Sequence, residues 1–181
     1  LGVERVAYLR GDQSNEQITD PVTGTTTGIF RKRTSLLGDI VNSDPHYVGT
    51  PDYRYHLLPG TEGESYRTFR SSSSYRNRTP MLYVGANDGM LHAFNATNLV
   101  ERFAYVPNGV FSKLSALTSP DYSHRFLVDG SPRSGDAYIN GGWKTVLVGG
   151  LSAGGKSIFA LDIPNPGGFS GDNVLWEFTH A

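Results

Sequence analysis

The feature that most constrains the fold is a strand–turn–strand pattern that occurs twice. In the first copy, PMLYVGANDGMLHAFN at residues 80–95, Asp88-Gly89 separates two apolar runs. Asp-Gly between β-rich runs predicts a tight hairpin, because glycine accepts the positive φ that such turns require. The second copy, TVLVGGLSAGGKSIFALD at residues 145–162, has the same order of apolar run, glycine-rich turn and apolar run. Two similar hairpins indicate a repeated structural unit.

Matching segments flank both hairpins. Upstream, IVNSDP at residues 40–45 matches LVDGSP at 127–132, and downstream FAY at 103–105 matches WEF at 176–178. Segments that recur in the same order predict a radial repeat. We therefore expect an all-β dominated fold, part of a modified β-propeller with about two blades and short helical insertions. Within the hairpins, the matched positions are Gly85 with Gly149 and Phe94 with Leu161.

Composition supports this fold and excludes several functions. The 22 glycines, 10 prolines and 12% aromatic residues favour many short strands and turns. The net charge of −1 gives no electrostatic footprint for nucleic acid. The sequence contains no run of about 18 apolar residues, so no α-helical membrane span is predicted in this piece. The absence of cysteine excludes disulfides and thiolate metal sites.

The chain divides into an N-terminal part and a propeller part. Residues 1–30 are predicted to form a short helix and a polar loop, and residues 31–181 the first blades. Insertions are expected at about 49–80 and 107–122, the second with a helical pattern. The start without methionine and the end just after a strand suggest a fragment of a longer protein. Too few blades are present to close a propeller, so we expect an exposed apolar blade face.

The insertion at 49–80 is the candidate binding surface. It is rich in tyrosine, serine, arginine and asparagine, a composition that suits adaptable recognition. A tyrosine-lined loop packed on its own scaffold has the same composition, and the sequence leaves both interpretations open. The basic run at residues 31–33 is interpreted as a solvated face or as contacts with acidic neighbours.

Arg10-Gly11-Asp12 is a receptor-binding candidate. An exposed R-G-D can engage an integrin, with the aspartate completing a metal shell on the receptor and the arginine reaching an acidic groove. Alternatively, Gly11 ends the N-terminal helix and Asp12 caps a turn. The glycine fits both interpretations.

No catalytic residues are expected. GLSAGGKS at residues 150–157 fits the phosphate-loop pattern letter for letter, but a strand follows it, whereas a phosphate cradle needs a helix N-terminus. The histidines do not form an H-x-x-x-H pattern, and none has a carboxylate residue at the spacing typical of metal ligands. They are scattered at His46, His56, His92, His124 and His180.

The order of five segments resembles the C-terminal domain of the PilC/PilY family of type IV pilus adhesins and biogenesis factors, a quinoprotein-like β-propeller. The hairpin alone is weakly specific, and the co-occurrence of the segments in this order carries the resemblance. The segments are YLRGD at 8–12, RKRTSLLGDIVNSDP at 31–45, MLYVGANDGMLHAFNA at 81–96, FLVDGSP at 126–132 and GGWKTVLVGGLSAGGKSIFALDI at 141–163.

The resemblance implies a non-enzymatic protein at the pilus tip that supports pilus extension and retraction, twitching motility, adhesion and virulence. Its implied partners are minor pilins at the tip, a host-cell receptor, or both. Its implied location is the pilus (fimbrium) at the cell surface, associated with the periplasm and outer membrane. The alternative is a quinone-cofactor dehydrogenase, which shares the propeller repeat but needs residues converging from many blades and a metal on the axis.

The resemblance also implies a calcium-binding loop of EF-hand type. The nearest stretch, Asp12 to Asp20, lacks the glycine at position 6 and the second aspartate at position 3. We therefore expect no metal and no other cofactor in this fragment, and calcium bound beyond residue 181.

Overall fold

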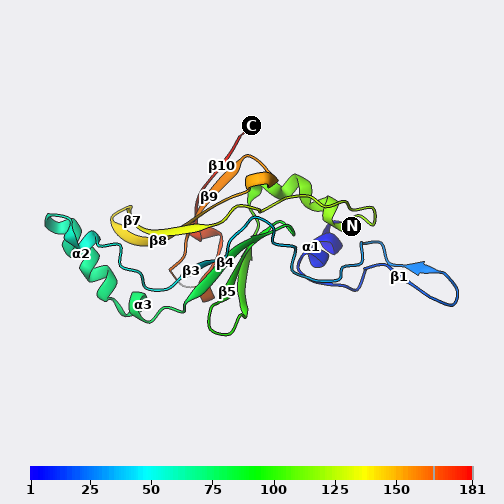
Figure 1. Ribbon diagram of the computed structural model, residues 1–181, viewed down its shortest axis with the longest axis horizontal. Helices are drawn as coiled ribbons and strands as arrows, with labels where there is room; N and C mark the ends of the chain where they lie inside the picture. Colours follow the sequence, from blue (N-terminus) through cyan, green and yellow to red (C-terminus); the bar gives the residue numbers. More distant parts are fainter. Residues whose placement is uncertain (165, 181) are drawn as a thin grey trace.

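Two four-stranded antiparallel sheets dominate the computed structural model, which describes residues 1–164 and 166–180. In each sheet, consecutive strands pair with one another (Figure 1). The predicted fold class, mostly β with about two propeller blades, is confirmed. Blade 1 contains β3 (His46–Val48), β4 (Met81–Ala86), β5 (Met90–Asn95) and β6 (Glu101–Tyr105). Blade 2 contains β7 (Arg133–Ile139), β8 (Gly142–Gly150), β9 (Ser157–Asp162) and β10 (Val174–Thr179).

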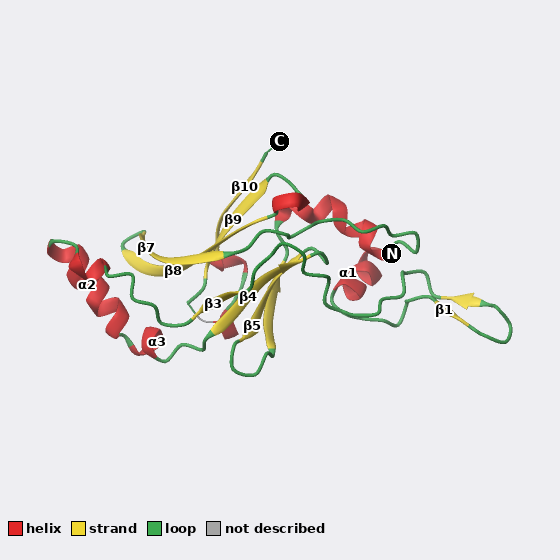
Figure 2. Cartoon of the chain, in the orientation of Figure 1, coloured by secondary structure: helices red, strands yellow, loops and turns green. Residues whose placement is uncertain are grey.

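The remaining elements lie around the two blades (Figure 2). The short strands β1 and β2 form an arm at one end of the long axis, and α2 and α3 lie at the other end (Figure 1). None of the helices in the described part of the chain is long and apolar enough to cross a membrane. The α-helices are α1 (Gly2–Leu9), α2 (Gly60–Ser71) and α3 (Ser73–Arg76), and the arm strands are β1 (Ile18–Thr19) and β2 (Thr26–Thr27). The 3-10 helices are η1 (Tyr55–Leu57), η2 (Asn108–Thr118), η3 (Ser152–Gly154), η4 (Pro166–Gly168) and η5 (Gly171–Asn173).

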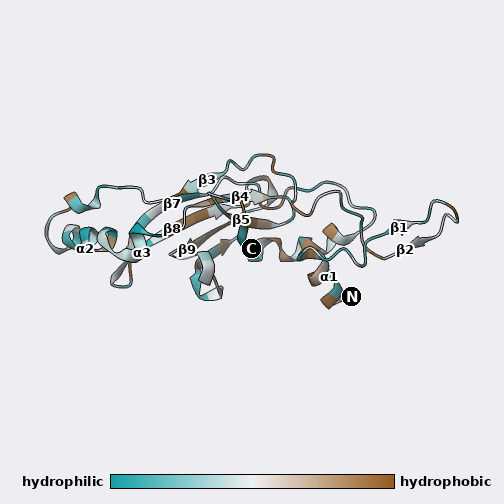
Figure 3. Ribbon diagram, turned by 90° about the horizontal axis from the view of Figure 1, so that it is seen from below, coloured by the Kyte–Doolittle hydropathy of each residue, from teal (hydrophilic) through white to brown (hydrophobic). Residues whose placement is uncertain are grey.

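One apolar core joins the two blades. Leu91 and Ala93 of β5 belong to the same buried cluster as Phe159 and Leu161 of β9. The rings of Tyr105 and Phe159 meet edge to face, with centroids 5.1 Å apart. Hydrophobic residues accordingly concentrate on the central strands, whereas α2 is mostly hydrophilic (Figure 3). The interface between the blades is therefore the centre of the fold.

The position of the core supports the predicted match of Phe94 with Leu161. Radially stacked blades turn opposite faces toward each other. Leu161 lies on the face of blade 2 that packs into the common core, toward blade 1. Phe94 lies on the face of blade 1 that points away from this core and lines a groove. The two residues therefore occupy the same face of their respective blades.

The predicted match of Gly85 with Gly149 is wrong by one residue. Gly85 of β4 pairs with Leu91 of β5. The match of Phe94 with Leu161 aligns β5 with β9, and in this alignment Leu91 corresponds to Ile158. The residue opposite Ile158 is Gly150, so Gly150 is the equivalent of Gly85. The turn between β8 and β9 is longer than the turn between β4 and β5. The pairing of β8 with β9 is shifted by one residue relative to the sequence match of Val148-Gly149 with Val84-Gly85. Side-chain alternation makes such a shift decisive, because one residue moves a side chain to the other face.

The equivalences also identify an exposed apolar surface on blade 2. We call it the open face, and it consists of Val148, Ile158, Trp176 and Phe178. The residues at the same positions in blade 1 are Tyr83, Leu91, Phe103 and Tyr105. Tyr83, Leu91 and Tyr105 are buried and Phe103 packs against the same core, whereas 64% of Phe178 is exposed. The open face thus has the position of an interface between blades.

The two segments that precede the blades bond directly to each other. The backbone N–H of Asn42 donates to Oδ1 of Asp129 at 3.1 Å, and the Asn42 side-chain amide donates to Oδ2 at 2.7 Å. The Ser43 hydroxyl donates to the Gly130 carbonyl at 3.1 Å. Asn42 and Asp129 are the same position in the two repeat units. Residues at the same position in the two repeat units therefore connect the two units by hydrogen bonds.

Two predicted loops contain regular structure. The insertion at 49–80 lies between β3 and β4 and includes α2, whose glycine, serine and threonine residues are poor helix formers. Packing stabilises this helix, because Tyr66 is fully buried and its ring lies 4.6 Å from that of Trp143 on β8. The polar stretch within residues 1–30 likewise contains the β1–β2 hairpin.

Candidate functional site

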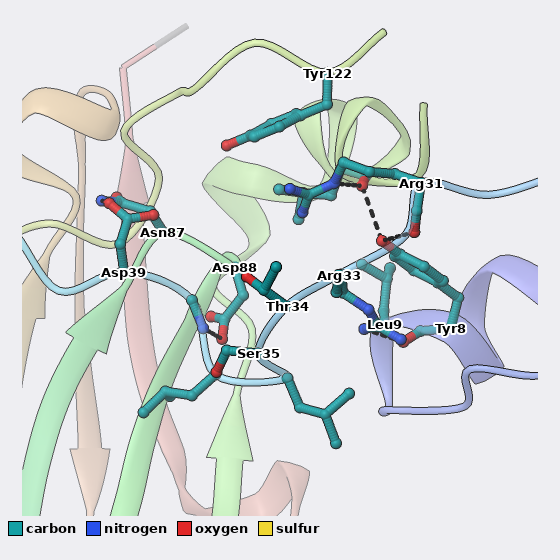
Figure 4. A pocket seen from close by; sticks show the side chains of 14 residues that line it. Tyr8, Leu9, Arg31, Arg33, Thr34, Ser35, Asp39, Asn87, Asp88 and Tyr122 are labelled. Carbon is teal, nitrogen blue, oxygen red and sulfur yellow. Dashed lines mark hydrogen bonds between the residues drawn. The ribbon is translucent and has the colours of Figure 1, made fainter. Parts of the chain in front are cut away.

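Two adjoining grooves, of about 460 and 680 Å³, lie between the N-terminal segment and blade 1. Both are lined by Leu9, Leu36, Leu37 and Asp88. Figure 4 shows the smaller groove, with Tyr8, Arg31 and Tyr122 around one side and Asp39, Asn87 and Asp88 toward the other. The two sides place cationic and anionic groups opposite one another, so the groove suits a polar ligand with charges of both signs.

A buried ion pair fixes the N-terminal segment at this groove. Arg33 Nε lies 2.6 Å from Glu16 Oε1, and both side chains are less than a tenth exposed. The Arg33 guanidinium also donates to the Tyr8 carbonyl at 2.7 Å and lies 3.6 Å above the Tyr8 ring centroid. Burial alone would raise the pKa of Glu16, but the hydrogen bonds and charge of Arg33 outweigh it and lower that pKa. The predicted contact of the basic run with an acidic neighbour is confirmed.

Arg31 and Asp39 form the two polar walls. The Arg31 guanidinium lies 4.2 Å from the Tyr122 ring centroid and donates to the Leu117 carbonyl at 3.2 Å. Asp39 accepts from the Asn87 amide at 2.9 Å, and Nε2 of His124 lies 2.7 Å from the same oxygen, Oδ2. Burial raises the pKa of Asp39, but the hydrogen bonds of Asn87 and His124 and the charge of His124 outweigh burial and lower that pKa. The Asp39 carboxylate therefore stays charged at neutral pH.

His92 lies in the larger groove between two carboxylates. Its Nδ1 is 2.5 Å from Glu101 Oε1, and its Nε2 is 3.0 Å from Asp88 Oδ2. Asp88 also accepts from the Gly38 backbone N–H at 2.8 Å, which joins the N-terminal segment to blade 1. Burial lowers the pKa of His92, but the bonds and charges of Asp88 and Glu101 outweigh burial and raise it. Sequence reasoning placed His92 in a strand but missed both partners.

We expect His92 to make stability depend on pH. A folded pKa above the unfolded value of about 6.5 contributes stability that is complete below that pH and is lost as the pH rises through the folded pKa. The difference in unfolding free energy between wild type and His92→Gln should therefore shrink as the pH rises above about 6.5. Urea titrations across this range measure the difference, and a constant value would contradict the proposed charged histidine.

The R-G-D sequence lies at the end of α1, beside the larger groove. Gly11 has a φ of 105°, its N–H donates to the Tyr8 carbonyl at 2.9 Å, and the Asp12 N–H donates to the Ala7 carbonyl at 2.9 Å. These are the two bonds of a Schellman cap, so the glycine is needed to end the helix. The side chains of Arg10 and Asp12 remain exposed. The structural interpretation of Gly11 and the accessibility of the charged residues are therefore compatible.

The Asp12 to Asp20 stretch uses its carboxylates in local turns. Asp12 Oδ1 accepts from the Ser14 N–H at 2.8 Å, and this backbone bond is the main reason that the pKa of Asp12 is lowered. Asp20 Oδ1 accepts from the Val22 and Thr23 N–H groups at 2.7 and 3.1 Å. Over residues 1–164 and 166–180, the structure brings together no group of three or more His, Asp or Glu side chains that could hold a metal ion.

The phosphate-loop pattern at 150–157 contains η3 and runs directly into β9. The predicted strand after the pattern is confirmed. A phosphate cradle of that type depends on the N–H groups of a following helix, and a strand does not provide them.

A buried polar network that sequence reasoning missed anchors the insertion to blade 2. Asp136 of β7 accepts hydrogen bonds from the hydroxyls of Tyr66 at 2.8 Å, Tyr75 at 3.2 Å and Thr145 at 2.7 Å. Arg78 in turn donates to the Thr145 hydroxyl at 2.7 Å. Burial, followed by the bond to Asp136, raises the pKa of Tyr66. Tyr66 and Tyr75 are therefore packed and hydrogen-bonded within the fold.

The arrangement of the two blades defines the class of protein. Two stacked four-stranded blades, joined by repeat-equivalent hydrogen bonds, are part of a β-propeller. The family model described as the PilY1 beta-propeller domain matches residues 37–180, and the chain belongs to this family. The resemblance derived from the five segments is thereby confirmed.

Curated relatives and a solved structure support the assignment. The type IV pilus biogenesis factor PilY1 of Pseudomonas aeruginosa strain PAK is 46% identical over 97% of this chain, which spans 14% of that protein. A PilY1 homolog of Xylella fastidiosa is 45% identical over 95% of this chain and 12% of its own length. The crystal structure of the Pseudomonas aeruginosa PilY1 C-terminal domain is 41% identical, with a TM-score of 0.56 over 74% of this chain and 25% of that one. The chain thus corresponds to a small part of the curated relatives.

Proposed function

We propose that the protein containing this chain is a non-enzymatic type IV pilus biogenesis factor. The observation that carries the proposal is the identity of 46% over 97% of the chain to a protein of that name. In this role the two blades are a scaffold, and the R-G-D end of α1 and the insertion are the surfaces offered to partners. Pilus association implies a location in the cell envelope or at the cell surface.

The finer proposal is a place at the pilus tip, with roles in extension and retraction, twitching motility and adhesion. Minor pilins and a host-cell receptor are the proposed partners. The exposed Arg10 and Asp12 side chains support receptor contact, because the helix cap uses only the backbone of this sequence. Asp12 stays exposed although its Oδ1 accepts from the Ser14 N–H. Calcium, expected from the family, is proposed to bind in another part of the protein.

The geometry of His92 supports action by contact instead of catalysis. Both ring nitrogens lie within hydrogen-bond distance of protein carboxylates. A histidine held in this way must break one of these bonds before it can accept a proton from a substrate. The quinone-cofactor dehydrogenase remains the alternative, and thermal-shift measurements with pyrroloquinoline quinone and calcium, followed by a dehydrogenase assay, distinguish it.

Deletion of the encoding gene tests the proposal. We expect loss of surface pili and of twitching, with reduced attachment to host cells, and restoration of all three by the wild-type gene. Complementation with Asp12→Ala should restore pili and twitching but not attachment if the R-G-D sequence binds a receptor. Asp121→Ala, which changes another exposed aspartate, is the matched control. Normal piliation, motility and attachment in the deletion strain would contradict the pilus role.

A further inference from the structure

The insertion forms a pocket of about 590 Å³ whose lining consists of hydrogen-bond donors. The pocket lies where η1, α2 and α3 meet, and we call it the arginine pocket. No carboxylate is among its lining residues. These residues are Thr50, His56, Arg67, Arg70, Ser71, Tyr75 and Arg76. In a chain with a net charge of −1, this is a strong local excess of positive charge.

The arginines of the pocket differ in whether their charge is neutralised. Arg70 Nη1 pairs with Asp52 Oδ2 at 2.9 Å, and the same carboxylate lies 3.5 Å from the ring of His56. Arg67 donates to the His56 backbone carbonyl at 2.9 Å, which fixes its position without cancelling its charge. Within the described residues, neither Arg67 nor Arg76 forms an ion pair, and both are exposed. Two guanidinium groups with uncompensated charge therefore line the same pocket.

Neutralisation of the helix end does not explain this arrangement. Cations near a helix C-terminus are favourable because they offset the unsatisfied carbonyl groups. At the end of α2, however, the Ser72 N–H already donates to the carbonyls of Thr68 and Phe69, at 3.1 and 3.2 Å. The Ser71 and Ser72 hydroxyls donate to the same two carbonyls, at 3.0 and 2.6 Å. Two of the last four carbonyls of α2 thus already have hydrogen-bond donors, and Arg67 donates to the His56 carbonyl of η1 instead of to a carbonyl at the end of α2.

We propose that the arginine pocket binds an oxyanion group, a carboxylate, sulfate or phosphate carried by a ligand. Guanidinium groups match such oxygens in pairs, and charge-assisted bonds of this kind are the strong ones. Thr50 adds a hydroxyl-bearing residue to the lining, and the volume of the pocket is larger than one anion, which leaves space for the rest of the ligand. The proposal rests on the insertion alone and does not depend on the pilus role.

Calorimetric titration of the full chain with sodium sulfate, sodium phosphate and sodium acetate tests the pocket. Sodium chloride at matched ionic strength distinguishes a site from general screening. We expect saturable binding of at least one oxyanion, and the comparison of acetate with sulfate and phosphate identifies the preferred group. Arg67→Gln with Arg76→Gln should weaken this binding at least about tenfold, since two charge-assisted bonds are removed.

Two further variants make the result decisive. The pair Arg102→Gln and Arg125→Gln removes the same charge from exposed positions outside the pocket and should leave binding unchanged. Asp52→Asn removes the carboxylate that competes for Arg70 and should tighten binding. Heats equal to those of chloride, or equal losses in the pocket and control pairs, would overturn the proposal.

Discussion

Asp136→Leu is expected to lower the free energy of unfolding by about 3–5 kcal/mol, because it removes the shared acceptor of a buried network. The Tyr66 and Thr145 hydroxyls lose their acceptor, and the Arg78 charge beside Thr145 loses a neighbouring countercharge. Burying polar groups without partners is costly, and Tyr66 is fully buried. Urea unfolding followed by tryptophan fluorescence measures the change, since Trp143 packs against Tyr66.

Controls separate the network from general effects of substitution. Asp121→Leu changes an exposed aspartate and should alter stability by less than about 0.5 kcal/mol. Tyr66→Phe removes one donor and should cost about 1–2 kcal/mol in the wild type but less in the Asp136→Leu background. Additive effects, or a loss below about 1 kcal/mol for Asp136→Leu, would show that the network contributes little.

Self-association through the open face is the second large expected effect. Trp176 and Phe178 occupy the positions of Phe103 and Tyr105, which pack into the core between the blades. An exposed patch of this kind favours contact with another apolar surface. We expect the isolated chain to associate, and Trp176→Ser with Phe178→Ser to raise the concentration needed for association by about tenfold or more. Light scattering over a dilution series measures the shift.

The first helix supplies the matched control for the open face. Val3 and Val6 of α1 are also exposed and apolar, but they lie outside any blade interface. Val3→Ser with Val6→Ser should leave association unchanged. A monomeric wild-type chain, or an equal effect of both double variants, would show that the open face does not mediate association.

The sequence was sufficient for the blades because their information is local. Asp88-Gly89 fixes a turn, alternating apolar residues fix two faces, and the order of repeated segments indicates a propeller. The register of the second hairpin was not predictable, since Val148-Gly149 matches Val84-Gly85 in letters while the pairing of β8 with β9 places Gly150 at the equivalent position. Letter identity does not report which residue lies opposite which.

The candidate sites were less predictable because they depend on contacts between distant segments. The composition of α2 argues against a helix, and only packing on Trp143 and the bond from Tyr66 to Asp136 explains it. Asp136 is 70 residues from Tyr66, so no local pattern connects them. His92 and Glu101 likewise meet only because β5 pairs with β6. The R-G-D sequence was visible, but whether its side chains are accessible required the fold.

The course of the insertion affects how the chain would bear tension. Residues 49–80 leave blade 1 between β3 and β4, and Tyr66 and Tyr75 then bond to β7 of blade 2. This connection runs in parallel with the apolar core between the blades. A load that pulls the blades apart must break the hydrogen bonds to Asp136 and, at the same time, separate the apolar core between the blades. The two blades should consequently yield as one mechanical unit instead of peeling away in sequence.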